Sequence, residues 1–301
     1  MSRTRYSFID ILGITLGVIV TLIVIGSVVT IARGRMFDAR VTFMGFNGPW
    51  RSGNFSFGPA VTEEKDEQVP AGATELELRN VAGSIEIRGN AGGELAVHSV
   101  RTAPFKAALE NLRVDIRREG NRVIVAEKHD PGFMSRTGTV SFSVAVPKGM
   151  KLIAAHSVSG GITVQGVEPG IDQVLSTISG GISTDRAHDL DASSTSGSIR
   201  FTSAGSSLSV RTVSGSIRGV IESLPNGGTA HLGTVSGSVS LNAWPGLDAA
   251  VSLHSLSGRV SCDFPISATE QKNNRLSGTI GKGAASLDVG TVSGSISISK
   301  M

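Results

Sequence analysis

The phrase Val-Ser-Gly-Gly-Ile at residues 158–162 decides the fold, because close variants of it return seven more times up to Ser299. Successive copies lie 16 to 22 residues apart. A repeat of this length with loops of varying size is typical of a solenoid, in which each coil stacks on a neighbouring coil. The central glycines of the eight copies are Gly160, Gly180, Gly197, Gly215, Gly237, Gly258, Gly278 and Gly294.

The positions around each glycine describe the coil. Position minus one is always serine, position minus three is Ser or Thr except at Arg275, and position minus five is apolar except at Asn273. We predict a strand, a tight corner and a second strand, with the hydroxyls stacked as corner ladders at the strand spacing of about 4.8 Å. Eight equivalent serines do not indicate an active site. Position plus two is β-branched and apolar throughout, as expected of a core-facing strand residue, and holds Ile162, Ile182, Ile199, Ile217, Val239, Val260, Ile280 and Ile296.

An earlier copy of the phrase lies between Leu76 and Ile87, with Ala82 in place of the serine. Alternating apolar runs follow up to Val146, and the turn from Arg118 to Asn121 indicates a hairpin. We therefore expect residues 74–149 to form a first coil and an antiparallel sheet that caps the stack, because an end coil exposes its core and its edge. Residues 150–301 are predicted to form about eight coils. The fold class is all-β, a single-strand-stack β-solenoid resembling a parallel β-helix or β-roll.

Residues 11–32 contain no charged side chain. As a helix at about 1.5 Å per residue they would span about 33 Å, enough for a bilayer core of about 30 Å. We predict a single transmembrane helix here, after a short tail of residues 1–10. A cleaved signal peptide is the alternative, but the stretch is longer than the apolar segment of about 7–15 residues that such signals use.

Residues 33–73 connect this helix to the repeats. They begin with six aromatic residues between Phe37 and Phe57, which fit either the lipid headgroup zone or a strand under the cap, and they end in an acidic stretch that reads as a solvated linker. Residues 1–40 carry five arginines and two aspartates, which accounts for the whole net charge of +3. The basic character therefore indicates a membrane rather than nucleic acid. Arginines on both sides of the helix leave its orientation open.

Few residues suggest chemistry. Cys262 is the only cysteine, so an intramolecular disulfide is excluded, and its place in the repeat predicts a small core residue. His156 and His254 share one column of the repeat but lie five coils apart, too far to bind one metal ion. His188 has Asp185, Asp189 and Asp191 nearby in sequence; such a set suits a cation, although loops of this kind are more often solvated.

Enzymes built on parallel β-helices need two carboxylates, or a carboxylate-bound cation with a basic partner, projecting from one face. No column of this repeat accumulates acids, and of the outward-facing position plus three only Arg200 and Arg218 are charged neighbours. We therefore assign no catalytic residue, no cofactor and no metal ligand.

Two longer segments, TELELRNVAGSIEIRG at residues 74–89 and VSFSVAVPKGMKLIAAHSVSGGITVQG at residues 140–166, precede the run of Ser-Gly phrases. Together they resemble the putative-adhesin family of bacterial envelope proteins, domains of unknown function that often join a membrane anchor to a β-solenoid. The resemblance covers about residues 70–301. It implies an extracytoplasmic, non-enzymatic role in adhesion, envelope structure or stress sensing, and it brings no catalytic residues.

The leading expectation is a single-pass membrane protein that displays a β-solenoid outside the cytoplasm, in the periplasm or at the cell surface, as an adhesin-like binding or structural module. Its partners would be the bilayer, through residues 11–32, and an envelope glycan or protein, without nucleic acid. One alternative is a regulatory or stress-sensing membrane subunit, favoured by the Gly13-x-x-x-Gly17 spacing. Another is a scaffold that self-assembles through an open C-terminal coil. A polysaccharide-active enzyme is a weaker alternative.

Overall fold

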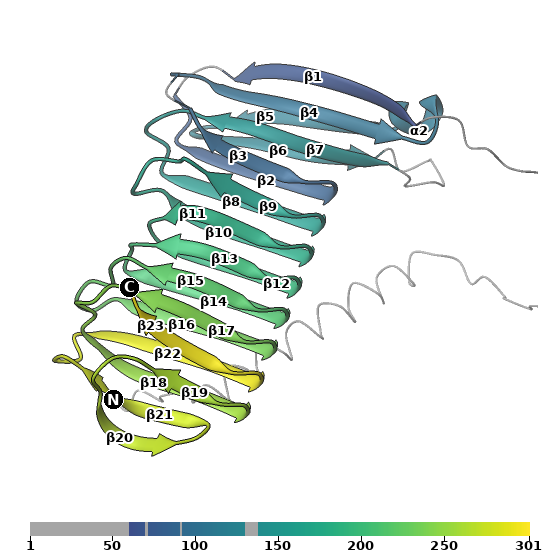
Figure 1. The fold of residues 1–301 in the computed structure, drawn as a ribbon. Coiled ribbons are helices and arrows are strands. Elements are labelled where there is room, and N and C mark those ends of the chain that lie inside the picture. Colours follow the sequence, from purple (N-terminus) through teal and green to yellow (C-terminus); the bar gives the residue numbers. More distant parts are fainter. Residues whose placement is uncertain (1–59, 70–71, 91, 130–137) are drawn as a thin grey trace, which may run out of the picture. The chain divides into compact units, whose positions relative to one another are not determined.

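The computed structural model describes residues 60–69, 72–90, 92–129 and 138–301 (Figure 1). The predicted tail, the transmembrane helix at 11–32 and the aromatic segment lie outside these residues. Within the described part of the chain no helix is long and apolar enough to cross a membrane. The membrane anchor therefore stays a prediction.

Two facing sheets build the fold, one of 11 strands and one of 12. Each coil supplies one strand to each sheet, so the stack is double, and the expected single strand stack is corrected. The reason is the corner glycine, which turns the chain from one sheet into the other. The coils are β2 (Glu75–Ala82) with β3 (Ile85–Gly89), β8 (Leu152–Ser159) with β9 (Ile162–Gln165), β10 (Asp172–Ser179) with β11 (Ile182–Ala187), β12 (Leu190–Ser196) with β13 (Ile199–Ser203), β14 (Ser207–Ser214) with β15 (Ile217–Ile221), β16 (Thr229–Ser236) with β17 (Val239–Ala243), β18 (Ala249–Ser257) with β19 (Val260–Cys262), and β22 (Ala285–Ser293) with β23 (Ile296–Lys300).

The core lies between the two sheets and follows the predicted columns. Side chains at position plus two, such as Ile162 and Ile217, are fully buried, as are Leu175 and Val210 at position minus five. These columns confirm the reading of the repeat. In the coils, position minus two, which is apolar except at Thr195, lies on the outside of the corner, where Ile178 is 54% exposed and Leu256 is 75% exposed.

Close backbone contact explains why the corner residue is glycine. A Cβ atom at Gly160 would lie 1.9 Å from the carbonyl oxygen of Gly83, and one at Gly180 would lie 2.2 Å from that of Gly160. No side chain fits at such distances. The same contact repeats through the stack in the spatial order Gly83, Gly160, Gly180, Gly197, Gly215, Gly237, Gly294 and Gly258.

The hydroxyl ladder differs from the expected one. The serines at position minus one are in register between neighbouring coils, for example Ser179 beside Ser159 and Ser196, but they are exposed. The hydroxyls at position minus three are buried, and six of them donate to the carbonyl of a corner glycine in the neighbouring coil instead of to another hydroxyl, whereas the hydroxyl of Ser157 has no hydrogen-bond partner. The pairs are Thr177 to Gly160 (3.1 Å), Ser194 to Gly180 (3.1 Å), Thr212 to Gly197 (2.9 Å), Thr234 to Gly215 (3.0 Å), Thr291 to Gly237 (3.0 Å) and Ser255 to Gly294 (2.8 Å).

The coils are not stacked in sequence order at the C-terminal side. Strand β22 pairs in parallel with both β16 and β18, and β23 pairs with both β17 and β19, so the last coil of the sequence is inserted between two earlier ones (Figure 1). The expectation of an open C-terminal coil is therefore corrected. Both edges of that coil are already occupied by hydrogen bonds.

The phrase around Gly278 does not form a coil. It lies in β21 (Arg275–Ile280), which pairs antiparallel with β18 and with β20 (Ser267–Lys272). Residues 150–301 thus contain seven coils rather than about eight, and the β20–β21 hairpin covers the edge of β18. Arg275 and Asn273, the two exceptions in the columns, occupy this copy: it lacks both the corner hydroxyl and the core residue.

The cap at the other end confirms the antiparallel prediction. Strand β4 (Leu95–Ala103) pairs antiparallel with β7 (Thr139–Val146), and β5 (Leu112–Glu119) forms the predicted hairpin with β6 (Arg122–His129). A short helix, α2 (Lys106–Glu110), lies between β4 and β5. Strands β7 and β6 then pair in parallel with β3 and β2, so the cap continues both sheets of the stack.

The acidic stretch expected to be a linker also belongs to the cap. Residues Val61–Val69 form β1, antiparallel to β4. Its side chains are nearly all exposed, so its sequence lacks the alternation of apolar residues that predicts a strand. Polar side chains across the pair support it, because Glu63 forms an ion pair with Arg101 and Asp66 lies 2.6 Å from His98.

Candidate functional site

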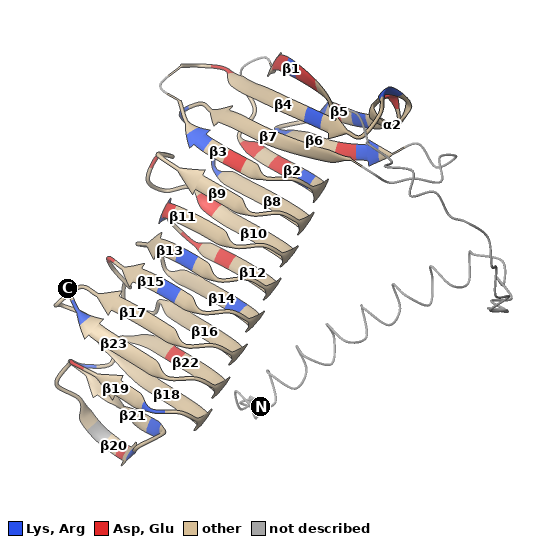
Figure 2. Cartoon of the chain, turned by 45° about the vertical axis from the view of Figure 1, so that its right-hand side comes forward, with Lys and Arg blue, Asp and Glu red and all other residues tan. Residues whose placement is uncertain are grey.

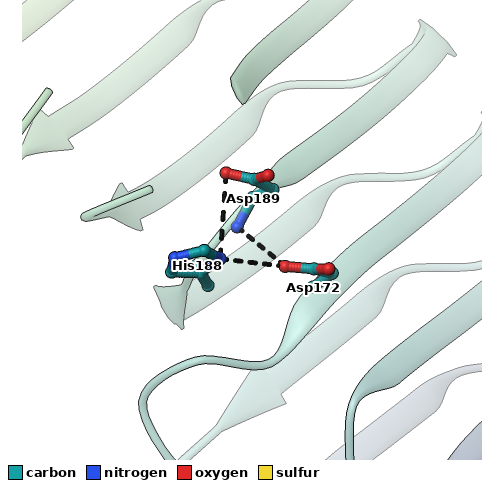
Figure 3. Close-up of side chains that lie close together, drawn as sticks. All are labelled: Asp172, His188 and Asp189. Carbon is teal, nitrogen blue, oxygen red and sulfur yellow. Dashed lines mark hydrogen bonds and ion pairs between the residues drawn. The ribbon is translucent and has the colours of Figure 1, made fainter. Parts of the chain in front are cut away.

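His188 lies in the one cluster of described residues whose side chains are arranged to hold a cation. It sits between β11 and β12, with its Nδ1 atom 3.0 Å from Oδ1 of Asp172 and 3.8 Å from Oδ1 of Asp189 (Figure 3). One ligand atom from each residue lies within 4.8 Å of the others. Two carboxylates and an imidazole are suitable ligands for a divalent cation.

The members of this cluster differ from those expected. Asp189 is present, but Asp185 instead accepts a hydrogen bond from the backbone N–H of Gly166 at 2.9 Å, and Asp191 lies in β12 outside the cluster. Asp172 comes from the neighbouring coil, 16 residues earlier. Sequence proximity could not identify it, because the contact arises from stacking.

The two carboxylates already have hydrogen-bond donors. Oδ1 of Asp189 accepts from the backbone N–H groups of Ser206 and Ser207, both at 2.8 Å, and Oδ1 of Asp172 accepts from the N–H of Asp189 at 3.3 Å. A cation would have to compete with these donors. The geometry therefore fits best a set of carboxylate hydrogen bonds that joins the loops of successive coils.

Similar hydrogen bonds between a carboxylate and backbone N–H groups recur in other loops. Oδ1 of Asp248 accepts from the N–H groups of Lys282, Gly283 and Ala284 at 2.7, 2.6 and 3.1 Å. These hydrogen bonds, that of Ala284 first, lower the pKa of the Asp248 carboxyl. Glu168 likewise accepts from the N–H of Gly149. Several acidic side chains between the coils thus hold the loops through hydrogen bonds with backbone N–H groups.

The histidines of the repeat are separate, as expected. His156 lies in β8, where its Nδ1 atom is 2.6 Å from Oγ of Ser176, and burial lowers its pKa. His254 lies in β18, six strands away in the same sheet. Burial also lowers the pKa of His254. The inserted coil places Asp288 between His254 and His231, at 3.9 and 3.8 Å, an arrangement that the sequence order concealed.

Cys262 ends β19 and is half-buried, packed against the core. Burial raises the pKa of its thiol, which lowers the fraction of reactive thiolate at neutral pH. The structure agrees with a small core residue.

A continuous row of position plus three side chains crosses the outer face of the 11-stranded sheet. Consecutive members are direct partners across neighbouring strands. The row is hydroxyl-rich, with one acid at its end and two adjacent arginines in its middle, and Figure 2 shows the arginine-bearing strands β13 and β15 side by side. In spatial order it contains Glu86, Thr163, Ser183, Arg200, Arg218, Ser240, Ser297 and Ser261.

Two of the surface depressions on the described residues have both polar and apolar groups in their linings. One, of about 260 Å³, includes Arg200 and Arg218 together with Gly161 and Gly181. The other, of about 670 Å³, lies on the cap. The charged groups of the cap depression are largely paired with protein groups, as in the Asp66–His98 contact and the ion pair between Arg88 and Glu86. The depression on the row is therefore the better candidate for ligand binding.

A comparison with solved structures found several similar chains of low sequence identity. They include a putative cell adhesion protein from Clostridium sporogenes (12% identity, 80% of this chain and 100% of that chain covered, TM-score 0.37). A putative adhesin from Bacteroides fragilis shares 10% identity over 79% of this chain and 97% of its own, with a TM-score of 0.39. A putative lipid binding protein from Parabacteroides distasonis shares 9% identity over 79% and 96%, with a TM-score of 0.25.

No curated protein is similar to the chain. The model of one family, described as Toastrack DUF4097, matches residues 135–299. The match covers more than half of the chain and takes in every coil of the stack except β2–β3, and it agrees with the resemblance drawn from the repeats. The chain belongs to the Toastrack DUF4097 family, whose domain has no assigned function.

Proposed function

We propose that this chain is a non-enzymatic binding module of the bacterial cell envelope, anchored in the membrane by residues 11–32 and with its stack outside the cytoplasm. The observation that carries the proposal is the hydroxyl-rich row on the outer face of the 11-stranded sheet. It presents one side chain per coil, at a strand spacing of about 4.8 Å, on a scaffold whose corners are fixed by buried hydrogen bonds.

Rigidity supports a binding role. Side chains held on paired strands lose little further freedom when a ligand binds, which favours affinity for an extended partner. Ser and Thr hydroxyls both donate and accept hydrogen bonds, and they match the hydroxyl groups of a glycan. An envelope glycan is therefore the partner that we favour for this surface.

The acidic residues argue against hydrolysis within the described part of the chain. Hydrolysis of glycans uses a pair of carboxylates facing a common bond. The carboxylates of Asp185, Asp189 and Asp248 accept backbone N–H groups in the loops, and the outer row contains only Glu86, which is paired with Arg88. These positions favour a surface that binds without cleaving.

The location can be tested with a C-terminal reporter that is active only outside the cytoplasm, fused to the full-length chain. We expect an active fusion in the membrane fraction, and release into the soluble fraction when residues 11–32 are deleted. An inactive fusion, together with an active fusion to a second reporter that works only in the cytoplasm, would refute the proposed localisation.

Binding can be tested by co-sedimentation of the detergent-solubilised protein with insoluble peptidoglycan. We expect retention by the glycan, with no shortening of the glycan chains after long incubation. Release of sugar fragments that disappears in Asp185→Asn or Asp189→Asn would replace this proposal with an enzymatic one.

A further inference from the structure

Arg200 and Arg218 are direct partners on the neighbouring parallel strands β13 and β15. Both are exposed, and neither has a hydrogen bond or an ion pair from its side chain to any described residue. Like charges directly opposite each other on a sheet are destabilising. The fold thus retains an unfavourable pair that an external anion would stabilise.

Among the described residues, no acid lies next to the two arginines in the row, and Asp185, two residues after Ser183 on β11, already accepts the backbone N–H of Gly166. On one side the row continues through Ser183 and Thr163, and on the other through Ser240. The acid in the row, Glu86, lies beyond Thr163 and pairs with Arg88. Within the row, the two guanidinium groups are therefore flanked directly by neutral hydroxyl side chains.

The depression beside the arginines results from a change in the repeat. Position plus one is glycine at Gly161 and Gly181, whereas the next two coils in sequence have serine there, Ser198 and Ser216. The backbone leaves more room for a side chain here than at the corner, because a Cβ atom would lie 3.4 Å from the nearest backbone oxygen at Gly161 and 3.3 Å at Gly181, against about 2 Å at the corner glycines. The two missing side chains leave space next to the arginines.

We infer that Arg200, Arg218 and the Gly161–Gly181 depression form a subsite for the anionic group of an acidic polysaccharide. This inference deepens the proposed function and rests on it. A guanidinium group forms two parallel hydrogen bonds with a carboxylate, sulfate or phosphate, and two such groups on adjacent strands can share one anion. The flanking hydroxyls then bind the neighbouring sugar units.

A polymer fits this surface better than a small molecule. The depression of about 260 Å³ is open and lies below the range of about 300–1,000 Å³ in which pockets enclose small ligands. The row, by contrast, extends over eight strands with one outward side chain on each. The side chains of the row are hydroxyl or charged, without an aromatic ring on which a nucleic-acid base could stack.

The test is calorimetric titration of the full-length protein in detergent with polygalacturonate, with dextran sulfate and with neutral dextran. The main variant is Arg200→Ser with Arg218→Ser, because serine already occupies the adjoining positions of the row. We expect it to weaken binding of the acidic polymers about tenfold or more, as expected for the loss of charged hydrogen bonds. The two acidic arms show whether carboxylate or sulfate is preferred.

Arg211→Ser is the matched control. Arg211 is also exposed and lies in the coil of Arg218, but on β14 in the opposite sheet, so its loss should change affinity less than twofold. A second variant, Gly161→Ser with Gly181→Ser, fills the depression with the side chain that other coils carry. We expect it to weaken binding several-fold without lowering the unfolding temperature.

The outcomes separate the subsite from the wider function. Equal losses in Arg211→Ser and in the double arginine variant would indicate a general charge effect and refute the subsite. Retention on peptidoglycan without binding of either acidic polymer would refute the subsite and leave the proposed function standing. Absence of binding to all of these glycans would overturn both.

Discussion

Two copies of the repeat phrase, at residues 276–280 and 292–296, have nearly the same sequence and opposite roles. The first, around Gly278, lies inside an antiparallel strand, and the second, around Gly294, forms the corner of the inserted coil. The difference lies upstream. Thr291 donates to the carbonyl of Gly237 and Val289 is buried, whereas Arg275 and Asn273 stand at the matching positions of the first copy.

This comparison teaches that Ser-Gly alone does not make a corner. Six of the coils also have a buried hydroxyl at position minus three, which donates to the carbonyl of the neighbouring corner glycine, and an apolar residue at position minus five, which fills the core. Without the hydroxyl, a half-buried carbonyl would lose its partner, at a cost of about 1–3 kcal/mol. The predictions below test these contributions separately.

The largest effect should come from alanine at the two glycines. Gly294→Ala places a Cβ atom 1.9 Å from the carbonyl oxygen of Gly237, so we expect a loss of about 3 kcal/mol in the free energy of unfolding. Gly278→Ala, in a strand, should change it by less than about 1 kcal/mol, because Gly is itself unfavourable there. Urea unfolding followed by circular dichroism measures both; equal losses would contradict the proposed difference between the copies.

A smaller effect is expected from the hydroxyls at position minus three. Ser255 donates to the carbonyl of Gly294 at 2.8 Å, whereas the buried Oγ of Ser157 has no hydrogen-bond partner. Ser255→Ala should therefore cost about 1 kcal/mol, and Ser157→Ala, which removes a polar atom that gains nothing from burial, should be neutral or stabilising. Chemical denaturation of the two variants provides the comparison. Greater damage from Ser157→Ala would show that the hydroxyls act in another way.

The smallest effect concerns pH. Asp248 holds the loop that leads into the inserted coil, and its pKa is lowered in the folded protein. A lowered folded-state pKa stabilises the protein above the unfolded pKa of about 3.9, and this stabilisation is lost as the pH falls through the folded value. Asp248→Asn should thus be less stable than the native chain at pH 7 and equally stable near pH 2. Thermal unfolding across this range tests it, and a constant difference at all pH values would exclude the carboxylate as its source.

Much of the fold could be predicted from local sequence. The buried columns, the first coil at Leu76–Ile87 and the hairpin at Arg118–Asn121 follow from alternation and turn residues, which act over a few positions. The order of coils could not be predicted. All coils share one register, so the edge of β16 can pair with β22 as well as with β18. No single repeat phrase distinguishes between these two neighbours.

The candidate site residues also divide into those that local sequence predicts and those that only the stacking of coils brings together. Arg200 and Arg218 could be placed side by side because their coils are consecutive both in sequence and in space. Asp172 was missed because it reaches His188 from the neighbouring coil, and Asp288 was missed because it meets His231 only after the last coil inserts. Strand β1 was missed because its pairing depends on the backbone and on surface charge rather than on apolar side chains.

The inserted coil also sets a limit on how the chain can fold during synthesis. Coils up to β16–β17 can form in the order in which they leave the ribosome, each on the one before it. The final stack cannot extend past β16 until β22 has been synthesised, since the next neighbour of β16 in the folded protein is β22, which pairs Thr229 with Ser286 across 57 residues. Loop closure over such a distance is slow compared with local pairing. Until the last coil is made, the edge of β18 that later pairs with β22 stays unpaired. An unpaired strand edge favours misassembly and chaperone binding during this interval.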